Sequence, residues 1–131
     1  VYKKSDLTMK KILIGFVTVI VVIFIFVKIS SDGLPGSLKN SFCDYTESEY
    51  GYTVKDLELE EGFHHGSMDL TYYIVIGLVD GGEYDDQYVL ALITEPGKSY
   101  GDYYDTSYKI WGYFDTRYDA QDYYYSNPNL S

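Results

Sequence analysis

The 131-residue chain contains 20 acidic and ten basic residues and has a formal net charge of −10, so one domain of ordinary size is expected. The charge is divided unevenly: residues 1–28 contain five lysines and one aspartate, whereas residues 29–131 contain five basic and 19 acidic residues. So acidic a region repels phosphate groups, which argues against nucleic acid as a partner. It also contains 16 of the 17 tyrosines together with aliphatic runs, a composition that excludes a disordered tail.

An uncharged apolar run lies between Lys11 and Lys28. As a helix it is about 24 Å long, and lysine side chains at both ends extend its reach towards the roughly 30 Å hydrocarbon core of a bilayer. Lysines precede the run and acids follow it, which predicts a cytoplasmic N-terminus and an extracytoplasmic remainder. We therefore expect a single-pass protein of the cell membrane with four parts: a cytoplasmic basic tail (1–11), a transmembrane helix (12–29), a linker (30–37) and an extracytoplasmic domain (38–131).

Two other interpretations of the apolar run stay open. A cleaved signal peptide has a shorter apolar region, and a lysine such as Lys28 is unusual just before a cleavage site. The Gly15-Phe16 pair is similar to the cleavage site of type IV prepilins, although the glutamate of that family would fall at Ile20. Met9 followed by two lysines is a natural start, and this opening before an acidic, tyrosine-rich domain is typical of small membrane-anchored proteins of Gram-positive bacteria.

The outer region alternates helix and strand signals. Ser37 is a candidate N-cap for a helix that presents Leu38 and Phe42 on one side and stops at Gly51. Apolar and aromatic runs predict four strands, at 52–59, 68–79, 87–95 and 107–114. Connections this short favour an antiparallel meander.

A short C-terminal helix should follow, capped by Asp115 or Thr116 and ending near Tyr125. The fold class is thus α+β: one helix packed on a four-stranded antiparallel meander, followed by a short C-terminal helix. This order of elements resembles cystatin-like and related helix-on-sheet domains. The resemblance implies an architecture only, because the inhibitory Gln-Val-Val-Ala-Gly loop of cystatins is absent from the sequence.

Few residues are candidates for catalysis or metal binding. His64 and His65 are adjacent, so on an extended chain they point to opposite faces and are expected in a polar turn rather than on a metal. Cys43 is expected as a buried thiol on the helix, with intermolecular pairing as the alternative. The acidic clusters at 56–62, 80–86 and 101–105 are expected as solvated hairpin tips, since they depart from the known Ca²⁺ loop patterns. No cofactor or metal is predicted.

Tyrosine is the most informative residue type, because it supplies a large contact area with a polar tip and recurs at binding surfaces. Nine tyrosines fall in the last third of the chain. Tyr72 and Tyr108 are expected in the core. The predicted partner-binding residues are Tyr103, Tyr104, Tyr123 and Tyr124.

The sequence thus predicts a non-enzymatic, membrane-anchored binding domain outside the cytoplasm, with a basic protein or peptide as its partner. An immunity or accessory protein of a bacterial envelope is one concrete form. Two alternatives are a structural subunit of a membrane complex or surface filament, and a metal-dependent hydrolase that uses the histidine pair and the acidic loops.

Overall fold

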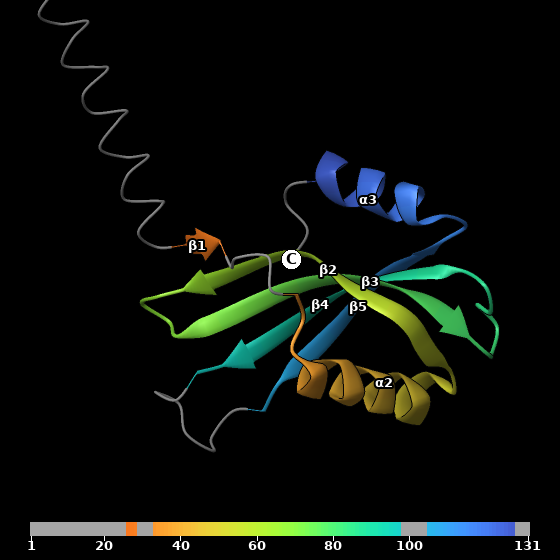
Figure 1. Ribbon diagram of the computed structural model, residues 1–131, viewed down its shortest axis with the longest axis horizontal. Helices are drawn as coiled ribbons and strands as arrows, with labels where there is room; N and C mark the ends of the chain where they lie inside the picture. Colours follow the sequence, from red (N-terminus) through yellow and green to blue (C-terminus); the bar gives the residue numbers. More distant parts are fainter. Residues whose placement is uncertain (1–25, 29–32, 98–104, 128–131) are drawn as a thin grey trace, which may run out of the picture.

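The computed structural model describes residues 26–28, 33–97 and 105–127. The elements in chain order are β1 (Phe26–Lys28), α2 (Gly36–Tyr50), β2 (Thr53–His65), β3 (Leu70–Asp80), β4 (Tyr88–Pro96), β5 (Ser107–Phe114) and α3 (Arg117–Ser126). The strands form one antiparallel sheet in the order β1-β2-β3-β4-β5 (Figure 1). The predicted α+β domain is therefore confirmed: a helix on a four-stranded antiparallel meander, followed by a short C-terminal helix.

The fifth strand, β1, was not expected. Its residues Phe26–Lys28 pair with the end of β2, Phe63 to His65, in antiparallel register. They fall within the segment predicted as a transmembrane helix over 12–29, and they form a strand instead. The other residues of that segment and the tail 1–11 lie outside the described residues. In the part of the chain that the structure describes, no helix combines the length and hydropathy needed to cross a membrane.

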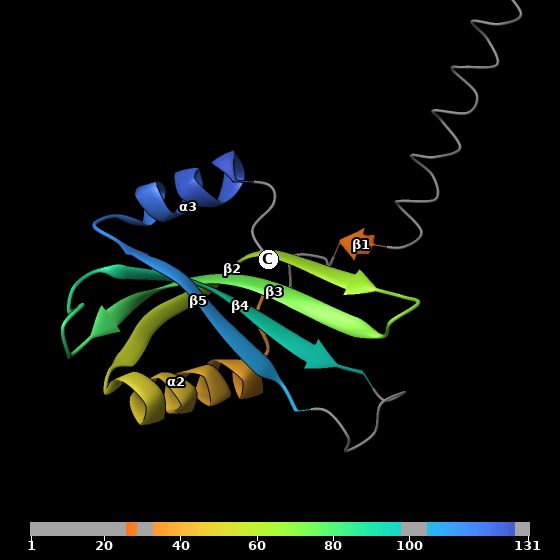
Figure 2. The same ribbon diagram turned by 180° about the vertical axis from the view of Figure 1, so that it is seen from behind.

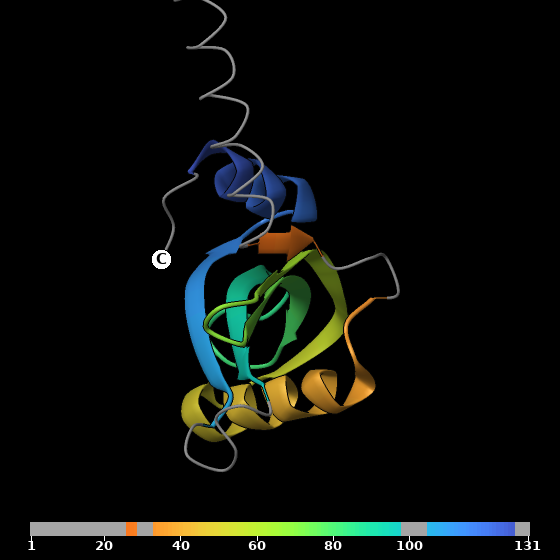
Figure 3. The ribbon, with the colours of Figure 1, turned by 90° about the vertical axis from the view of Figure 1, so that its left-hand side faces the viewer.

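The two helices cover opposite faces of the sheet, as the view along it in Figure 3 and the reverse view in Figure 2 both show. On the α2 side, the buried residues form one hydrophobic cluster: Leu34, Leu38, Phe42, Tyr52, Val54, Leu57, Tyr73, Val75, Val79, Val89, Ala91 and Ile93. The α3 side is closed by Ile74, Ile76, Leu90 and Ala120. Neighbouring β3 residues Val75 and Ile76 are both fully buried, because each faces a different helix.

Helix α2 begins one residue before the expected cap. Its N-cap is Pro35, which makes no side-chain capping bond, in place of Ser37. Its C-terminus is the predicted one: Gly51 has a φ of 77° and its amide bonds to the Glu47 carbonyl. Leu38, Phe42 and Thr46 form the buried stripe of the helix.

Strand β2 extends to His65, beyond its predicted end at residue 59, and so includes the acidic stretch 56–62 that was expected at a hairpin tip. Register shifts between Lys55 and Glu58 and between Leu59 and Glu61 interrupt its alternation. A bulge of this kind adds a residue on one strand and bends it. The carboxylates of the stretch are thereby placed along a strand, next to α3, instead of in a loop.

Candidate functional site

Helix α3 is fixed at its N-terminus by two local features. The Thr116 side chain accepts a hydrogen bond from the Asp119 amide at 3.0 Å, which is the expected cap. Asp119 also places an acidic group in the first turn, where the helix dipole favours it. Ala120, fully buried, packs on the apolar face of the sheet. The position of Ala120 decides which side of the helix points outwards.

Arg117 ties the start of α3 to two strands. Its Nη1 donates to the Ile76 carbonyl at 3.1 Å and its Nη2 donates to the Asp56 carbonyl at 2.9 Å. The guanidinium also lies 5.2 Å from the Tyr88 ring centroid and 3.6 Å from a Glu58 carboxylate oxygen. Asp56 belongs to the first β2 irregularity and has a φ of 50°, so Arg117 satisfies a carbonyl where the β2–β3 pairing is interrupted.

The C-terminal half of α3 is tied to β2 by carboxylates. The Tyr124 hydroxyl donates to Glu61 Oε2 at 2.6 Å, and the Tyr125 hydroxyl donates to Glu60 Oε1 at 2.9 Å. Gln121 Nε2 donates to the second oxygen of Glu60 at 3.1 Å. Burial and the bond to Glu60 raise the pKa of Tyr125 to about 12, and burial with the bond to Glu61 raises the pKa of Tyr124 further. Both phenols therefore stay protonated as donors even at about pH 10, where an ordinary tyrosine ionises.

The predicted partner-binding tyrosines divide into three groups. Tyr103 and Tyr104 lie outside the described residues. Tyr124 is half-buried and stacks on Trp111 at a ring separation of 6.0 Å. The Trp111 Nε1 is buried without a hydrogen-bond partner among the described residues. Tyr123 is more exposed, with its ring 5.2 Å from that of Phe114. Tyr124 thus has a role inside the domain, and Tyr123 is the better placed of the two for a partner.

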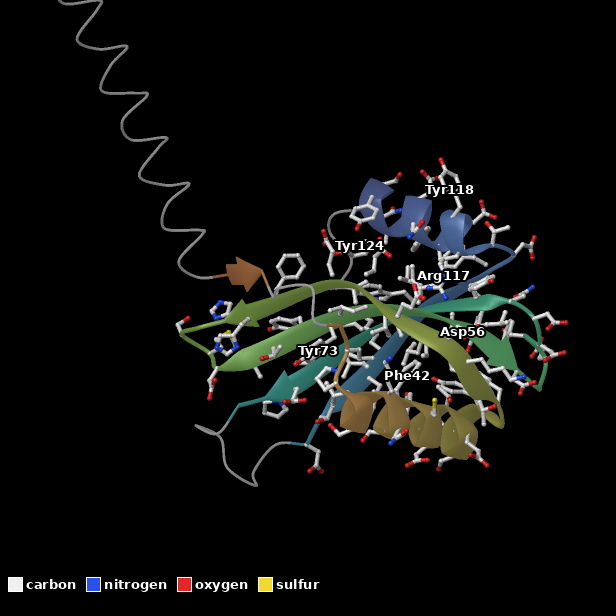
Figure 4. The ribbon with its side chains drawn as sticks, viewed as in Figure 1. Phe42, Asp56, Tyr73, Arg117, Tyr118 and Tyr124 are labelled. Carbon is white, nitrogen blue, oxygen red and sulfur yellow. The ribbon has the colours of Figure 1, made fainter. Side chains whose placement is uncertain are left out.

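The outward side of α3 carries other tyrosines. Tyr118 is 73% exposed and Tyr125 is 55% exposed. Asp119 and Asp122 are exposed beside them. We call these four residues the α3 outer face; Figure 4 shows Tyr118 pointing away from the sheet while Tyr124 and Arg117 point towards it. The sequence contained a pattern that could have predicted this face: Tyr118, Asp122 and Tyr125 recur at helical spacing, on another side of the helix from Ala120 and Tyr124.

Several of the other tyrosines lie on the α2 side of the sheet. Tyr108 packs against the α2-side core, as expected, and its ring is 4.6 Å from that of Tyr45. Tyr52 and Tyr113 share a hydroxyl–hydroxyl bond of 2.8 Å, and burial raises the pKa of both. The core prediction for Tyr72 was wrong: Tyr72 is only partly buried, and the neighbouring Tyr73 fills the core instead.

The histidine pair ends strand β2. The ring of His64 contacts Thr71 Oγ1 at 3.0 Å and Asp69 Oδ1 at 3.7 Å. His65 Nδ1 accepts the Met68 amide at 3.2 Å and so closes the β2–β3 turn. The two rings have separate partners, and no group of three or more His, Cys, Asp and Glu side chains is placed to hold a metal within the described residues.

Cys43 and the β3–β4 hairpin have structural contacts. The Cys43 thiol is partly buried and lies 3.3 Å from the Val54 carbonyl. In the hairpin, Asp85 accepts the Gly81 amide at 2.6 Å and Asp80 pairs with Lys55 at 3.2 Å. The acids of 80–86 are exposed on this hairpin, as expected, and Asp85 also stabilises its turn.

Comparison with known proteins gives no relative. No protein-family model matches the chain, and no curated protein or solved structure is detectably similar to it. The α3 outer face therefore has to be interpreted from its own chemistry.

Proposed function

We propose that this protein is a non-enzymatic, membrane-tethered domain outside the cytoplasm that binds a basic protein or peptide through the α3 outer face. The observation that carries the proposal is Tyr118, which is 73% exposed on a helix whose neighbouring outward side chains are Asp119 and Asp122. A large aromatic side chain left in solvent among carboxylates is better suited to a partner than to the domain's own stability.

The support of α3 favours binding, because a rigid surface loses little entropy when a partner docks. Arg117 fixes the first turn through two backbone carbonyls. Tyr124 and Gln121 fix the second half through Glu61 and Glu60. The outer face is therefore presented by a helix whose inner side is held along its whole length.

The charge of the outer face specifies the partner. Among the described residues, none of Asp115, Asp119 and Asp122 forms an ion pair, and Arg117, the only basic residue of α3, is turned towards the sheet. A basic partner neutralises these carboxylates, and long-range attraction steers its approach. An immunity or accessory protein of a secreted peptide system is one setting in which such a partner occurs.

The tether rests on the sequence. The apolar run, most of which precedes β1, is preceded by lysines and followed by an acidic domain, the pattern of a single-pass protein with its N-terminus in the cytoplasm. A domain with this orientation meets secreted peptides and other envelope components.

A photo-crosslinking amino acid at position 118 in the full-length chain tests the proposal in the native membrane. We expect it to capture a basic protein or peptide, with a yield that falls when salt is raised and when Asp119 and Asp122 are both changed to asparagine. The matched control carries the same group at Ser48, an exposed position on α2. Equal capture from 118 and 48, or capture of acidic proteins only, would show that the α3 outer face is not the binding surface.

A further inference from the structure

We propose that the α3 outer face selects arginine over lysine in its partner, an inference that rests on the proposed function and makes it more specific. The geometry that points to this is the helical spacing of one exposed aspartate between two exposed tyrosines. Tyr118, Asp122 and Tyr125 follow one another at the i, i+4 and i+7 positions of a single helix, so they share one stripe.

The spacing of the stripe suits a guanidinium. With a rise of about 1.5 Å per residue, Asp122 lies about 6 Å along the helix axis from Tyr118 and about 4.5 Å from Tyr125. These axial spacings are comparable with the roughly 6 Å range of a cation–π contact, so the stripe places Asp122 about one helical turn from each tyrosine. An arginine exploits both groups at once, because its planar guanidinium forms a bidentate bond with a carboxylate and stacks on an aromatic face, whereas lysine offers a compact and strongly hydrated charge.

The two rings differ in their support. Tyr125 is held in place by its bond to Glu60 and by an edge contact with Tyr124 at a ring separation of 4.9 Å. Tyr118 is the most exposed large hydrophobic side chain of the described residues. The Tyr125 ring is thus preorganised for a partner, and the Tyr118 ring is largely free to contact one.

The domain already uses the same chemistry for its own arginine. The Arg117 guanidinium lies 5.2 Å from the Tyr88 ring centroid and 3.6 Å from a Glu58 carboxylate oxygen. A tyrosine face combined with a carboxylate is therefore an arrangement in which this fold holds a guanidinium. Tyr118, which points away from the sheet in Figure 4, and the exposed Asp122 offer that pair of groups to the outside.

The test compares two peptides of equal length and charge, fluorescein-labelled hexa-arginine and hexa-lysine, against the full chain in nanodiscs of neutral lipid. Fluorescence anisotropy should show about three- to tenfold tighter binding of hexa-arginine, the size expected from one or two exposed cation–π contacts. Tyr118→Leu should bring the two affinities together, while Tyr118→Phe should keep most of the difference. Asp122→Asn should weaken both peptides by a similar factor.

Tyr50→Leu is the matched control, since Tyr50 is 49% exposed beside Glu49 on α2, and it should change neither affinity. Equal binding of the two peptides to the unaltered chain would overturn the arginine preference and leave the proposed function standing. A preference that persists in Tyr118→Leu would also overturn it, because the selection would then lie elsewhere. Failure of both peptides to bind, or binding unaffected by Asp122→Asn, would overturn the proposed function itself.

Discussion

The Arg117 guanidinium donates to the carbonyl of Asp56 at 2.9 Å and so joins the start of α3 to the interrupted part of strand β2, 61 positions earlier in the chain. A second bond to the Ile76 carbonyl brings β3 into the same contact. Because the bulge at Asp56 frees a backbone acceptor and Arg117 supplies a fixed pair of donors, the irregularity in β2 also acts as the docking point of the helix.

Replacing Arg117 should therefore loosen α3. We expect Arg117→Met to lower the free energy of unfolding by about 1–3 kcal/mol, since two charge-assisted bonds to backbone carbonyls, one of them partly buried, are lost. Arg117→Lys should recover only part, because one ammonium group cannot span both acceptors as the guanidinium does. Chemical denaturation followed by circular dichroism gives the values.

The control is Lys55→Met, which removes a solvent-exposed ion pair with Asp80 at 3.2 Å and should change stability by less than about 1 kcal/mol. If the two methionine variants were equally stable, the contact between Arg117 and Asp56 would be no more than a surface contact.

Gly77 is the second position at which the bulge imposes a requirement. It lies on β3 opposite the bulge, and a Cβ there would overlap Val54 Cγ1 and lie 2.9 Å from Leu57 Cδ1 and 3.3 Å from Leu57 Cα. Gly77→Ala should therefore destabilise the domain by about 2 kcal/mol or more, because two buried residues and a backbone atom have to move. Thermal melting measures the loss.

Gly36→Ala provides the comparison, since Gly36 begins α2 and nothing lies within 4 Å of its added methyl group. We expect this variant to melt at the same temperature as the unaltered chain or higher. Equal melting temperatures for the two alanine variants would mean that β2 shifts freely away from Gly77.

Local chemical signals were the most predictable part of the fold. Strand β5 occupies the predicted residues 107–114, Thr116 caps α3, and Gly51 ends α2. Each of these depends on a few adjacent residues whose conformational preferences agree, so no knowledge of the tertiary structure is required.

The errors arose where tertiary contacts override local patterns. The alternation of apolar residues cannot decide which of Tyr72 and Tyr73 is buried, because β3 is buried on both faces and either side chain would fit a core. The two irregularities in β2 shift its period, so the run of acids after Leu59 has the pattern of a loop although it is strand. The exposure of Tyr118 follows from how Ala120 seats α3 on the sheet, which is a contact between distant segments.

The tyrosine contacts predict a stability that falls at alkaline pH. The pKa of Tyr45 is raised to about 12 by its hydrogen bond with Tyr50 and by burial, and that of Tyr125 to about 12 by burial and the bond to Glu60. A raised pKa means that the folded state favours the protonated phenol. Its contribution is therefore full below the ordinary value of about 10 and is lost as the pH rises through 12.

Absorbance of tyrosinate and circular dichroism recorded together over this range should show that loss of structure accompanies ionisation of the held phenols. Tyr125→Phe should lose the stabilising bond to Glu60 at neutral pH and depend less on pH above 10. Complete ionisation of all tyrosines near pH 10 with the fold intact would contradict the assigned contacts.

Strand β1 leads to a prediction about orientation at the membrane. Phe26 pairs with His65, the last residue of β2, and most of the apolar run precedes Phe26 directly in sequence. If that run is inserted as we propose, the turn between β2 and β3 lies at the lipid surface. The hairpin between β3 and β4 lies at the other end of β3, whose 11 residues span about 36 Å. Figure 1 shows β1 beside the former turn and far from the latter.

Fluorophores attached to Met68→Cys, in the first turn, and to Glu83→Cys, in the second, distinguish the two ends after Cys43 is changed to serine. Nitroxides on the lipid headgroups should quench the label at 68 strongly and the label at 83 very little. A reporter fused after Ser131 should at the same time be extracytoplasmic and membrane-bound. Equal quenching of both labels would show that β1 does not set the orientation of the domain. Recovery of the full-length chain in the soluble fraction would contradict the proposed membrane anchor. With the turn at 68 held against the lipid, the acidic β3–β4 hairpin at the other end of β3 faces away from the membrane.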